Sequence, residues 1–533
     1  YMKSVMGRGN YDCLLDVEAG CDDVKVAEEA LARVTNTSPE TCTAALAPCK
    51  YAKGFKCTKM IPKTEMGEFD YTADSNNMCS YYGALAKAQN AMYFVGNTAY
   101  MMAMNKSGKV LPQRPFMIVD EAHQLANNMM SFHSLTVSQR MLEKLFQLPT
   151  QQDISSAKSE KKKDIYRKQR EMVLKVFDGN GSFGLPKINS MSLNTPLPTR
   201  KAALQTLGRY LFALRDEIKR KMKDKDIQTK YDKKELSYAS NSIARIDDLL
   251  ASIATDWENW VYQVDDHNEY PTWIAFKPLD VSAYADELLL NLGQQRILMS
   301  GTILDYDIFG RELGLKAEET AFIKVDYSPF PESNRPIYTH IKGGKLSRKD
   351  RGLESYKKCA DAIATIAAKY PDQKGLILPF TNDIEDGIVE ALKDNHPLVY
   401  ARLRQHSKIP KERDAVFREF EDEQNNEILI STYANQGFDG KMVGFTVIAK
   451  VPFGPLGDIQ VKAKAENDPK WYQMQTAVEL AQMVGRCVRS STDVGHTYII
   501  DPSFMFHFER GMKNNPLARV LPPYISTAII KNR

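Results

Sequence analysis

Short apolar runs alternate with amphipathic stretches along most of the chain, which is the pattern of an α/β fold. In the first part, a predicted helix at 81–89 and an apolar run at 91–95 come before a second apolar run at 115–119. We expect this second run to be a buried strand, because it is short and bounded by turn residues. A similar run at 295–299 predicts a further strand much later in the chain.

The last third of the chain repeats this alternation more regularly. The predicted helices are 357–369, 384–392 and 473–484, and the predicted strands are 375–378, 427–430, 446–450 and 496–500. The simplest architecture that contains both parts is a pair of α/β domains, each with a parallel sheet flanked by helices.

The stretch between the two parts has a different character. Residues 125–275 form long charged segments with helical periodicity, interrupted by a loop-rich region at 179–198. Residues 151–240 hold 21 Lys and Arg against 11 Asp and Glu, a local charge of +10. Such a surface could follow a phosphate backbone, although a solvated helical face explains the same charges. We interpret the stretch as a helical insertion whose helices are 139–146, 159–177 and 201–225.

Length and composition limit the class of protein. At 533 residues the chain exceeds the size of one hydrophobic core, so two large domains with insertions are expected. Its 43% hydrophobic and 26% charged residues are typical of globular proteins, whereas the net charge of +4 identifies no partner. The sequence has no run of 18 apolar residues and no signal-peptide pattern. We therefore expect a cytoplasmic protein with no membrane partner.

The eight cysteines are unevenly distributed. Disulfides are rare in intracellular chains of this length, so metal or iron–sulfur ligation is the better interpretation of the cysteines crowded into the first 80 residues. Zinc ligation and unliganded thiols stay open as alternatives. Cys359 and Cys487 lie far from the others, and we predict that they are packed thiols. The crowded cysteines are Cys13, Cys21, Cys42, Cys49, Cys57 and Cys79.

Two acidic residues and a histidine directly follow the strand predicted at 115–119. They are Asp120, Glu121 and His123. Hydrolysis of a nucleoside triphosphate needs a magnesium ligand and a group that orients water on the γ-phosphate. Asp120 would hold Mg²⁺, Glu121 would polarise the water, and His123 would link the nucleotide site to a later motif (motif III) or to the second domain. Solvated acids at a strand end are the plainer alternative.

A second candidate group for the nucleotide lies near the C-terminus. Gln482, Arg486 and Arg489 are spaced so that, on a continuous helix, they would share one face. Cations that approach the γ-phosphate stabilise the charge of the transition state and raise the rate by orders of magnitude. We predict that these residues contact ATP, with a basic surface helix as the alternative.

Further polar residues follow predicted strands and could contact nucleic acid or nucleotide. Thr302 follows the strand at 295–299, whereas Thr381 and Asn382 follow the strand at 375–378. Polar tips at strand ends suit contacts to a nucleic-acid backbone. The loop after the strand at 427–430 supplies Thr432 and Gln436 as backbone contacts and Gly437 and Asp439 near nucleotide or a domain interface. Each of these segments, taken alone, could also be a plain turn.

The pattern G-x-x-x-x-G-K-[ST], in which backbone N–H groups and a lysine hold phosphates, does not occur in the sequence. Residues 342–345, Lys-Gly-Gly-Lys, come nearest but lack the spacing and the hydroxyl residue. Because the chain starts at Tyr1 and not at methionine, we expect the phosphate loop to lie upstream.

The order of these motifs resembles that of the XPD/DinG helicases. We refer to Asp-Glu-Ala-His at 120–123 as the acidic box. It is followed by a long helical insertion and then by Met-Ser-Gly-Thr-Ile at 299–303, Leu-Pro-Phe-Thr-Asn at 378–382, Gly-Phe-Asp at 437–439, Val-Pro-Phe-Gly-Pro at 451–455 and Gln-x-x-Gly-Arg-x-x-Arg at 482–489. Gly-Arg-Gly-Asn-Tyr-Asp-Cys at 7–13 looks like the start of that family's iron–sulfur domain. Cys-Ser-Tyr-Tyr at 79–82 looks like its end, with Ser80 in place of the usual proline.

The resemblance implies one [4Fe–4S] cluster held by four thiolates. Cys13 and Cys79 are the firm pair, Cys49 and Cys57 are preferred for the other two positions, and Cys42 is the alternative. It also implies two RecA-like domains, with the cluster domain and a helical arch both inserted in the first. The predicted boundaries are 1–12, 80–124 and 276–325 for the first RecA-like domain, 13–79 for the cluster domain, 125–275 for the arch and 326–533 for the second RecA-like domain.

The function that follows from the resemblance is that of an ATP- and Mg²⁺-dependent 5′ to 3′ DNA helicase. It would move on single-stranded DNA and act on forks or R-loops, as a monomer, with closer likeness to bacterial or phage DinG-like proteins. In a bacterium it would be associated with the nucleoid, and a phage protein would act in the host cytoplasm. An RNA-directed helicase with an Asp-Glu-Ala-His box and a non-hydrolysing assembly protein on the same scaffold are the alternatives.

Overall fold

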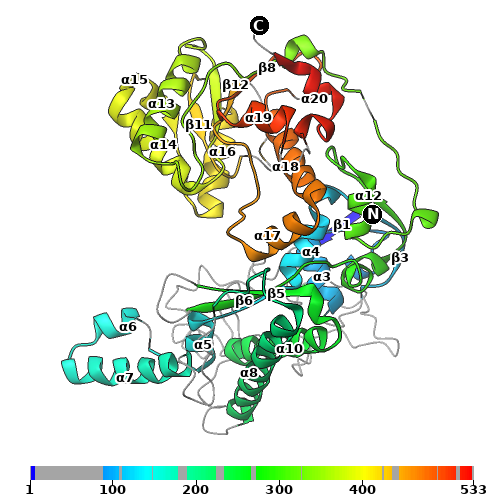
Figure 1. The fold of residues 1–533 in the computed structure, drawn as a ribbon, viewed down its shortest axis with the longest axis vertical. Coiled ribbons are helices and arrows are strands. Elements are labelled where there is room, and N and C mark those ends of the chain that lie inside the picture. The colour runs from blue at the N-terminus through cyan, green and yellow to red at the C-terminus, as the bar shows by residue number, and fades with distance from the viewer. Residues whose placement is uncertain are drawn as a thin grey trace, which may run out of the picture. The chain divides into compact units, whose positions relative to one another are not determined.

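The computed structural model describes two compact units, which we treat separately (Figure 1). The first comprises residues 1–119 and 124–298, and the second comprises 120–123 and 299–533. Within them the described residues are 2–5, 88–106, 111–146, 148–149, 151–177, 189–223, 233–265, 272–325, 327–422, 425–434, 438, 443–488, 490–511 and 516–530. The helix predicted at 81–89 therefore lies mostly outside the described residues, and the predicted domain boundaries stay predictions.

A seven-stranded sheet organises the second unit. Its order is β10-β11-β9-β12-β13-β8-β14, and all neighbouring strands are parallel. The strands are β8 (Ile337–Tyr338), β9 (Lys374–Leu378), β10 (Leu403–Arg404), β11 (Ile428–Ile430), β12 (Val443–Ile448), β13 (His496–Ile499) and β14 (Ile529–Ile530). The four strands predicted in this part of the chain are confirmed, with ends that differ by a few residues.

Helices cover both faces of this sheet because buried residues alternate along its strands. On β9, Leu376 and Leu378 pack in one apolar cluster, whereas Ile377 packs in the other. Figure 1 shows α13 and α14 on one side of the strands and α18 to α20 on the other. The helices are α12 (Tyr306–Glu312), α13 (Leu353–Ala367), α14 (Asn382–Asn395), α15 (Pro397–Tyr400), α16 (Pro410–Asp422), α17 (Ile459–Asn467), α18 (Pro469–Val484), α19 (Phe504–Glu509) and α20 (Pro523–Ala528).

The end of α18 corrects one expectation. The helix stops at Val484 and is capped by Gly485, so Arg486 and Cys487 lie beyond it. Glycine is about 1 kcal/mol less favourable in a helix than alanine, which weakens the helix at this point. Arg486 is therefore not on the helix, whereas its spacing from Gln482 had suggested that both lie on one helix face.

The first unit holds two pairs of parallel strands. β1 (Met2–Val5) pairs with β2 (Tyr93–Gly96), and β3 (Arg114–Val119) pairs with β7 (Gly293–Leu298). The strand predicted at 115–119 is thus confirmed, but it is not buried. Phe116 and Ile118, on one face of β3, are 61% and 64% exposed, because a strand is buried only where both of its faces are covered.

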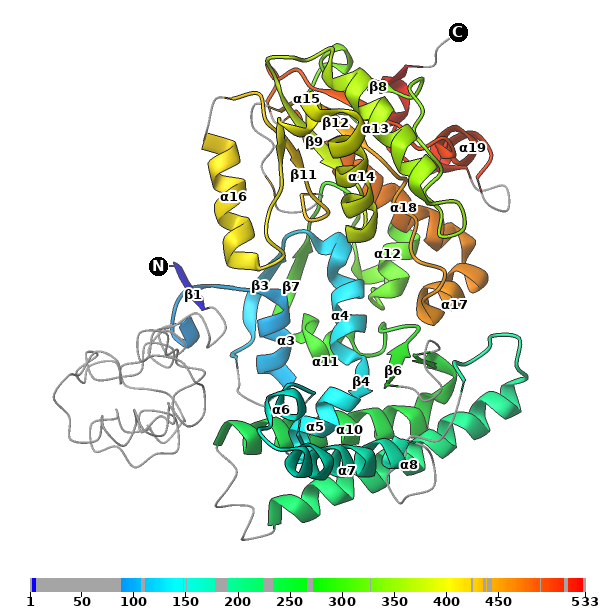
Figure 2. The same ribbon diagram turned by 90° about the vertical axis from the view of Figure 1, so that its left-hand side faces the viewer.

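The inserted segment of the first unit is not wholly helical, contrary to our expectation. It contains an antiparallel sheet of order β4-β6-β5, formed by Leu135–Ser138, Trp273–Pro278 and Trp260–Val264. Helices separate β4 from its partner β6 along the chain, so this pairing leaves no local signal in the sequence. Figure 2 shows the long helices α8 and α10 running beside each other. The helices of this unit are α3 (Thr98–Lys106), α4 (Leu125–His133), α5 (Gln139–Phe146), α6 (Gln151–Ser156), α7 (Glu160–Phe177), α8 (Leu197–Lys223), α10 (Lys233–Asp256) and α11 (Ala285–Leu288).

Apolar residues at helical spacing hold α8 against α10. Leu207, Leu211 and Leu214 are fully buried on α8, and Ile246 is fully buried on α10. Arg215 and Lys219 of α8 both reach Asp247 of α10, at 2.8 and 3.5 Å. The helices predicted at 139–146, 159–177 and 201–225 are confirmed as α5, α7 and α8. Among the described residues, none of the helices is long and apolar enough to cross a membrane.

Candidate functional site

The acidic box begins where β3 ends. Asp120 and Glu121 are exposed, and the backbone N–H of Glu121 donates to Oδ1 of Asp120 at 2.9 Å. Glu121 has a φ of 49°, a left-handed conformation that few residues other than glycine adopt. The sharp turn directs two carboxylates away from the strand end. Carboxylate oxygens of this kind are the protein ligands that Mg²⁺ prefers.

The ring of His123 lies beside this turn, largely buried. Its Nδ1 lies 2.7 Å from Oγ of Ser300 and 3.3 Å from Oε2 of Glu121. Burial lowers the pKa of His123, while the charge of Glu121 opposes this change. A neutral imidazole can either donate to or accept from the Ser300 hydroxyl, so the direction of this hydrogen bond depends on the tautomer of His123.

Ser300 and Thr302 extend the same network. The Ser300 hydroxyl donates to Oε2 of Glu121 at 3.3 Å, and it also lies 3.3 Å from the hydroxyl of Thr302. The Thr302 backbone N–H donates to Oγ of Ser300 at 3.1 Å. Thr302 is only 5% exposed, so its side chain faces the interior in this structure. Its predicted contact with nucleic acid stays a prediction.

Gln482, near the end of α18, connects this network to Arg486. Its Nε2 donates to Oγ1 of Thr302 at 3.0 Å, and its Oε1 accepts from Nη2 of Arg486 at 3.3 Å. Arg486 is 5% exposed, and its Nη1 donates to the carbonyl of Phe438 at 2.9 Å. We refer to the connected side chains of Glu121, Ser300, Thr302, Gln482 and Arg486 as the Glu121–Arg486 chain.

The Glu121–Arg486 chain can transmit a change at one end to the other. Hydroxyl and amide groups reorient when a neighbour changes charge or partner, and bonds in a low-dielectric chain reinforce one another. Because Gln482 both donates and accepts, a shift at Thr302 changes the partner available to Arg486. From the sequence, Glu121, Thr302, Gln482 and Arg486 were predicted as site residues in separate motifs. Ser300 belongs to the Met-Ser-Gly-Thr segment after the strand at 295–299, and the structure places its hydroxyl next to His123, Glu121 and Thr302.

A second polar group gathers at the carboxyl ends of β9 and β11, which are neighbouring strands. The Thr432 hydroxyl donates to Oδ1 of Asn382 at 2.9 Å, and its backbone N–H donates to Oε2 of Glu385 at 3.2 Å. The Thr381 hydroxyl donates to Oδ1 of Asp383 at 2.6 Å. Three of the residues predicted to contact nucleic acid, Thr381, Asn382 and Thr432, are therefore brought together.

The sequence missed the charged residues around this group. Burial raises the pKa of Glu385 to about 7, although the Thr432 N–H opposes the change. Lys450, which follows β12, has its Nζ 5.6 Å from the ring centre of Phe380, and burial lowers its pKa. Phe380 has a φ of 82°, and Arg351 forms an ion pair with Asp383. Positions just after parallel strands are the signal that could have identified Lys450.

The glycines of residues 342–345 cannot hold phosphate with the backbone in this conformation. The N–H of Gly343 donates to the carbonyl of Ile500 at 2.7 Å, and the N–H of Gly344 donates to Sγ of Cys359 at 3.2 Å. Both donors are satisfied inside the protein. Both the spacing of its residues and its satisfied backbone N–H groups therefore exclude this segment as a phosphate loop in this conformation.

Several predicted residues lie outside the described part of the chain. They are Arg489, Gln436, Gly437, Asp439 and the cysteines proposed for the cluster, Cys13, Cys42, Cys49, Cys57 and Cys79. In the part that is described, three or more His, Cys, Asp or Glu residues nowhere form a group suited to a metal ion. Cys359 and Cys487 are buried, as predicted for packed thiols.

Comparison with known families and structures identifies two matching regions. The family model DEAD_2 matches residues 13–142, and a model described as a helicase C-terminal domain matches residues 364–514. The acidic box lies in the first region, and Gln482 and Arg486 lie in the second. No curated protein matches the sequence.

One solved structure shares the fold. A structure titled "XPD_Helicase" matches 96% of this chain and 84% of its own, with 16% identity and a TM-score of 0.55. Two others, titled "XPD_APO" and "Structure of S. tokodaii Xpd4", each match 80% of this chain and 81% of their own. Their identities are 15% and 14%, and their TM-scores are 0.47 and 0.46. The predicted fold class, parallel sheets flanked by helices in two RecA-like domains, is confirmed by the first of these.

Proposed function

We propose that this chain, which matches DEAD_2 and a helicase C-terminal domain, is an XPD/DinG-like superfamily 2 protein that acts as an ATP-dependent 5′ to 3′ DNA helicase. It would translocate on single-stranded DNA and unwind forks or R-loops. The observation that supports this most strongly is the continuous Glu121–Arg486 chain. It joins the residues proposed for water activation to those proposed for the γ-phosphate.

In this proposal Glu121 orients the water that attacks ATP. The water oxygen forms a bond to the γ-phosphorus, the bond to the bridging oxygen of ADP breaks, and a water proton passes to Glu121. Asp120 would hold Mg²⁺, which when bound neutralises charge on the phosphate oxygens. His123 and Ser300 hold the Glu121 carboxylate in place, since Oε2 contacts both. Arg486 and Arg489 would stabilise the γ-phosphate, and Gly437 and Asp439 would lie near the nucleotide or a domain interface.

DNA would lie along the carboxyl edge of the seven-stranded sheet. The Asn382 carbonyl oxygen accepts from Thr432, which leaves the amide N–H groups of this exposed residue for a phosphate oxygen. The hydroxyl proton of Thr432 is already used, so Thr432 positions Asn382. Thr381, Gln436 and Thr302 complete the proposed set. Contacts of this type hold the backbone without selecting a sequence, as a translocating motor requires.

The finer assignments rest on the family resemblance. A [4Fe–4S] cluster would be held by Cys13, Cys49, Cys57 and Cys79, with Cys42 as the alternative, since clusters require soft thiolate ligands. The basic segment 151–240 would lie near the single strand, where Lys and Arg attract phosphate. The 5′ to 3′ direction, the monomeric state and a location beside cellular DNA belong to the same proposal.

A Glu121→Gln substitution in the full-length gene product tests the catalytic assignment. The amide keeps the size of the side chain but cannot take a proton from water. We expect DNA-stimulated ATP hydrolysis to fall at least about a hundredfold, the scale of general-base catalysis, while binding of ATP persists. Glu354→Gln, at an exposed residue of α13 that pairs only with Lys358, is the matched control. An unchanged rate for Glu121→Gln would refute the assignment.

Two further measurements test substrate and cofactor. Forked DNA, with a free 5′ or 3′ strand, and matching RNA should be compared in an unwinding assay, and we expect only DNA with a free 5′ strand to be unwound. Unwinding of RNA would favour the RNA-directed class, and nucleic-acid binding without hydrolysis would favour an assembly protein. Protein purified without oxygen should contain about four iron atoms per chain. A colourless protein without iron would exclude the cluster.

A further inference from the structure

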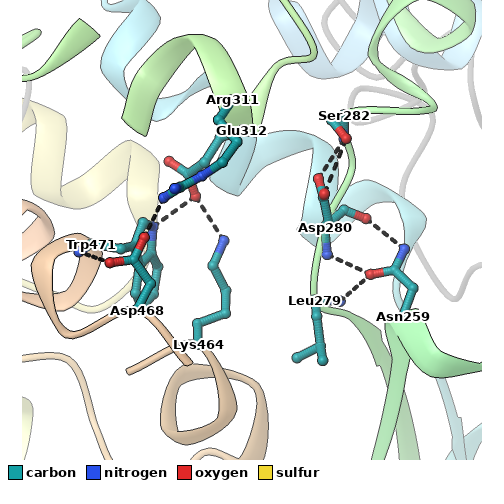
Figure 3. A network of polar contacts seen from close by, with 9 residues as sticks. All are labelled: Asn259, Leu279, Asp280, Ser282, Arg311, Glu312, Lys464, Asp468 and Trp471. Atoms are coloured by element: carbon teal, nitrogen blue, oxygen red, sulfur yellow. Dashed lines mark hydrogen bonds and ion pairs between the residues drawn. The ribbon is translucent and has the colours of Figure 1, made fainter. Parts of the chain in front are cut away.

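A buried carboxylate in the second unit has no part in the proposed chemistry. It belongs to Glu312, the last residue of α12, whose side chain is 11% exposed. Its Oε1 accepts from Nζ of Lys464 at 2.7 Å and from the indole Nε1 of Trp471 at 2.7 Å. Figure 3 shows the carboxylate between these two donors, which come from α17 and α18. A buried charge is costly unless it is fully paired, so this arrangement fixes the position of α12 closely.

Two more ion pairs repeat the same connection. Arg311 of α12 pairs with Asp468, whose Oδ1 accepts the N–H of Trp471 and caps α18 (Figure 3). Lys470 pairs at 2.6 Å with Asp305, which caps α12 by accepting the N–H of Ile308. The charged groups thus join the capping residue of each helix to the other helix. We refer to Arg311, Glu312, Lys464, Asp468 and Trp471 as the Glu312 clamp.

An apolar cluster continues from the clamp along α18. Ile308 of α12 packs with Trp471, Met474 and Val478, and each of these residues is almost fully buried. Apolar packing alone tolerates small shifts of one helix along another, whereas paired charges and an indole N–H do not. The clamp therefore sets the register of α18 against the segment that follows Thr302.

At the far end of α18, roughly 16 Å from Trp471 at 1.5 Å per residue, Gln482 donates to Thr302. The segment 302–312 is thus attached to α18 at both of its ends. We propose that Glu312 is a positioning residue, which holds α18 in the register that keeps Gln482 on Thr302 and so keeps the Glu121–Arg486 chain continuous. This inference rests on the proposed function only where hydrolysis is concerned.

Hydrogen exchange tests the inference without requiring activity. In the full-length protein, Glu312→Ala should speed amide exchange in residues 300–305 and 479–486, far from the substitution along α18. Glu312→Gln, whose oxygen still accepts from Trp471, should show a smaller effect. Glu354→Ala is the control, because this residue forms an exposed ion pair on α13. If amide exchange changes only in residues next to Glu312, the inference is overturned, because the clamp would then act only locally.

Kinetics test the same inference through a double-mutant cycle. Glu312→Ala should lower kcat for DNA-stimulated ATP hydrolysis by about three- to thirtyfold, with a smaller change in the KM for ATP. In a Gln482→Ala background the same substitution should have almost no further effect, because the link that it positions is already missing. If Glu312→Ala lowers kcat by the same factor in both backgrounds, the inference is overturned. A wild-type protein without ATP hydrolysis would instead contradict the proposed function, and the exchange experiment would still decide the role of Glu312.

Discussion

The side-chain amide of Gln482 donates to the hydroxyl of Thr302 at 3.0 Å, across 180 residues of sequence. One partner follows the strand that pairs with β3, and the other lies in the last turn of α18. Neither residue is charged, so the link is sensitive to geometry and not to salt. Because Gln482 also accepts from Arg486, a displacement of Thr302 by nucleotide would reach the guanidinium through a single side chain.

We predict that Gln482→Ala slows DNA-stimulated ATP hydrolysis about tenfold or more. The substitution removes the donor that Gln482 supplies to the buried Thr302 hydroxyl and one of the acceptors of Arg486, and lost hydrogen bonds to buried groups cost about 1–3 kcal/mol. Steady-state kinetics should show the loss mainly in kcat, since the link acts on the transition state. Gln405→Ala, an exposed glutamine, serves as control.

Thr302→Val provides the partner variant for that measurement. Valine keeps the shape of threonine but removes the hydroxyl that accepts from Gln482. If the two side chains act through one hydrogen bond, the double variant should be little slower than either single variant. Losses that multiply would mean that Gln482 and Thr302 act independently.

In its proposed role, Arg486→Lys should reduce ATP hydrolysis about a thousandfold, the scale of losing an arginine at the γ-phosphate, without unfolding the protein. The guanidinium donates to both the Phe438 carbonyl and Gln482, and a lysine ammonium cannot match that fork. Thermal unfolding followed by circular dichroism should accompany the rate measurement. Arg418→Lys, at an exposed position of α16, should retain full activity. Near-normal hydrolysis by Arg486→Lys would remove Arg486 from the site.

The sequence predicted the elements of the second unit well because their signals are local. Leu376 to Leu378 form an apolar run preceded by a glycine, and such runs identify central strands without knowledge of their partners. The Thr381, Asn382 and Thr432 group was predictable for the same reason, since the carboxyl ends of neighbouring parallel strands meet at one edge.

Contacts between distant segments could not be predicted. Glu312 meets Lys464 across 152 residues, and nothing near either residue indicates the pairing. The sheet of β4, β5 and β6 was missed because helices separate β4 from β5 and β6, and the charge pattern of these helices dominates the segment. The position of Arg486 was misjudged because periodicity was extended past Gly485, where the helix ends.

Cys359 should be almost unreactive in the folded protein. It is fully buried on α13, and burial raises the pKa of its thiol to about 11. Only about one thiol in a thousand would be ionised at pH 8, and the thiolate is the form that reacts. Iodoacetamide labelling, read by peptide mass spectrometry, should be at least about a hundredfold slower than in urea-unfolded protein. Rapid labelling of the native protein would show that this core opens readily.

Glu385 should make the stability of the second unit fall as the pH rises. Burial raises the pKa of its carboxyl from 4.5 to about 7, so between these values the folded state binds more protons than the unfolded state. Stability from this group is therefore fully present below pH 4.5 and is lost as the pH rises through about 7. Because the side chain is partly exposed, solvent screening limits the effect to about 1 kcal/mol.

Glu385→Gln tests this prediction, because the amide keeps the acceptor for the Thr432 N–H but cannot ionise. Relative to the wild type, the variant should gain about 1 kcal/mol in free energy of unfolding between pH 5 and pH 8. Chemical denaturation at several pH values measures this difference. Asp386→Asn, beside it on α14 and exposed, controls for the neighbouring charge. If the free energy of unfolding changes with pH in the same way for the wild type and the variant, Glu385 ionises normally. The Glu385 carboxylate beside Thr432 would then stay charged throughout the pH range in which the protein works.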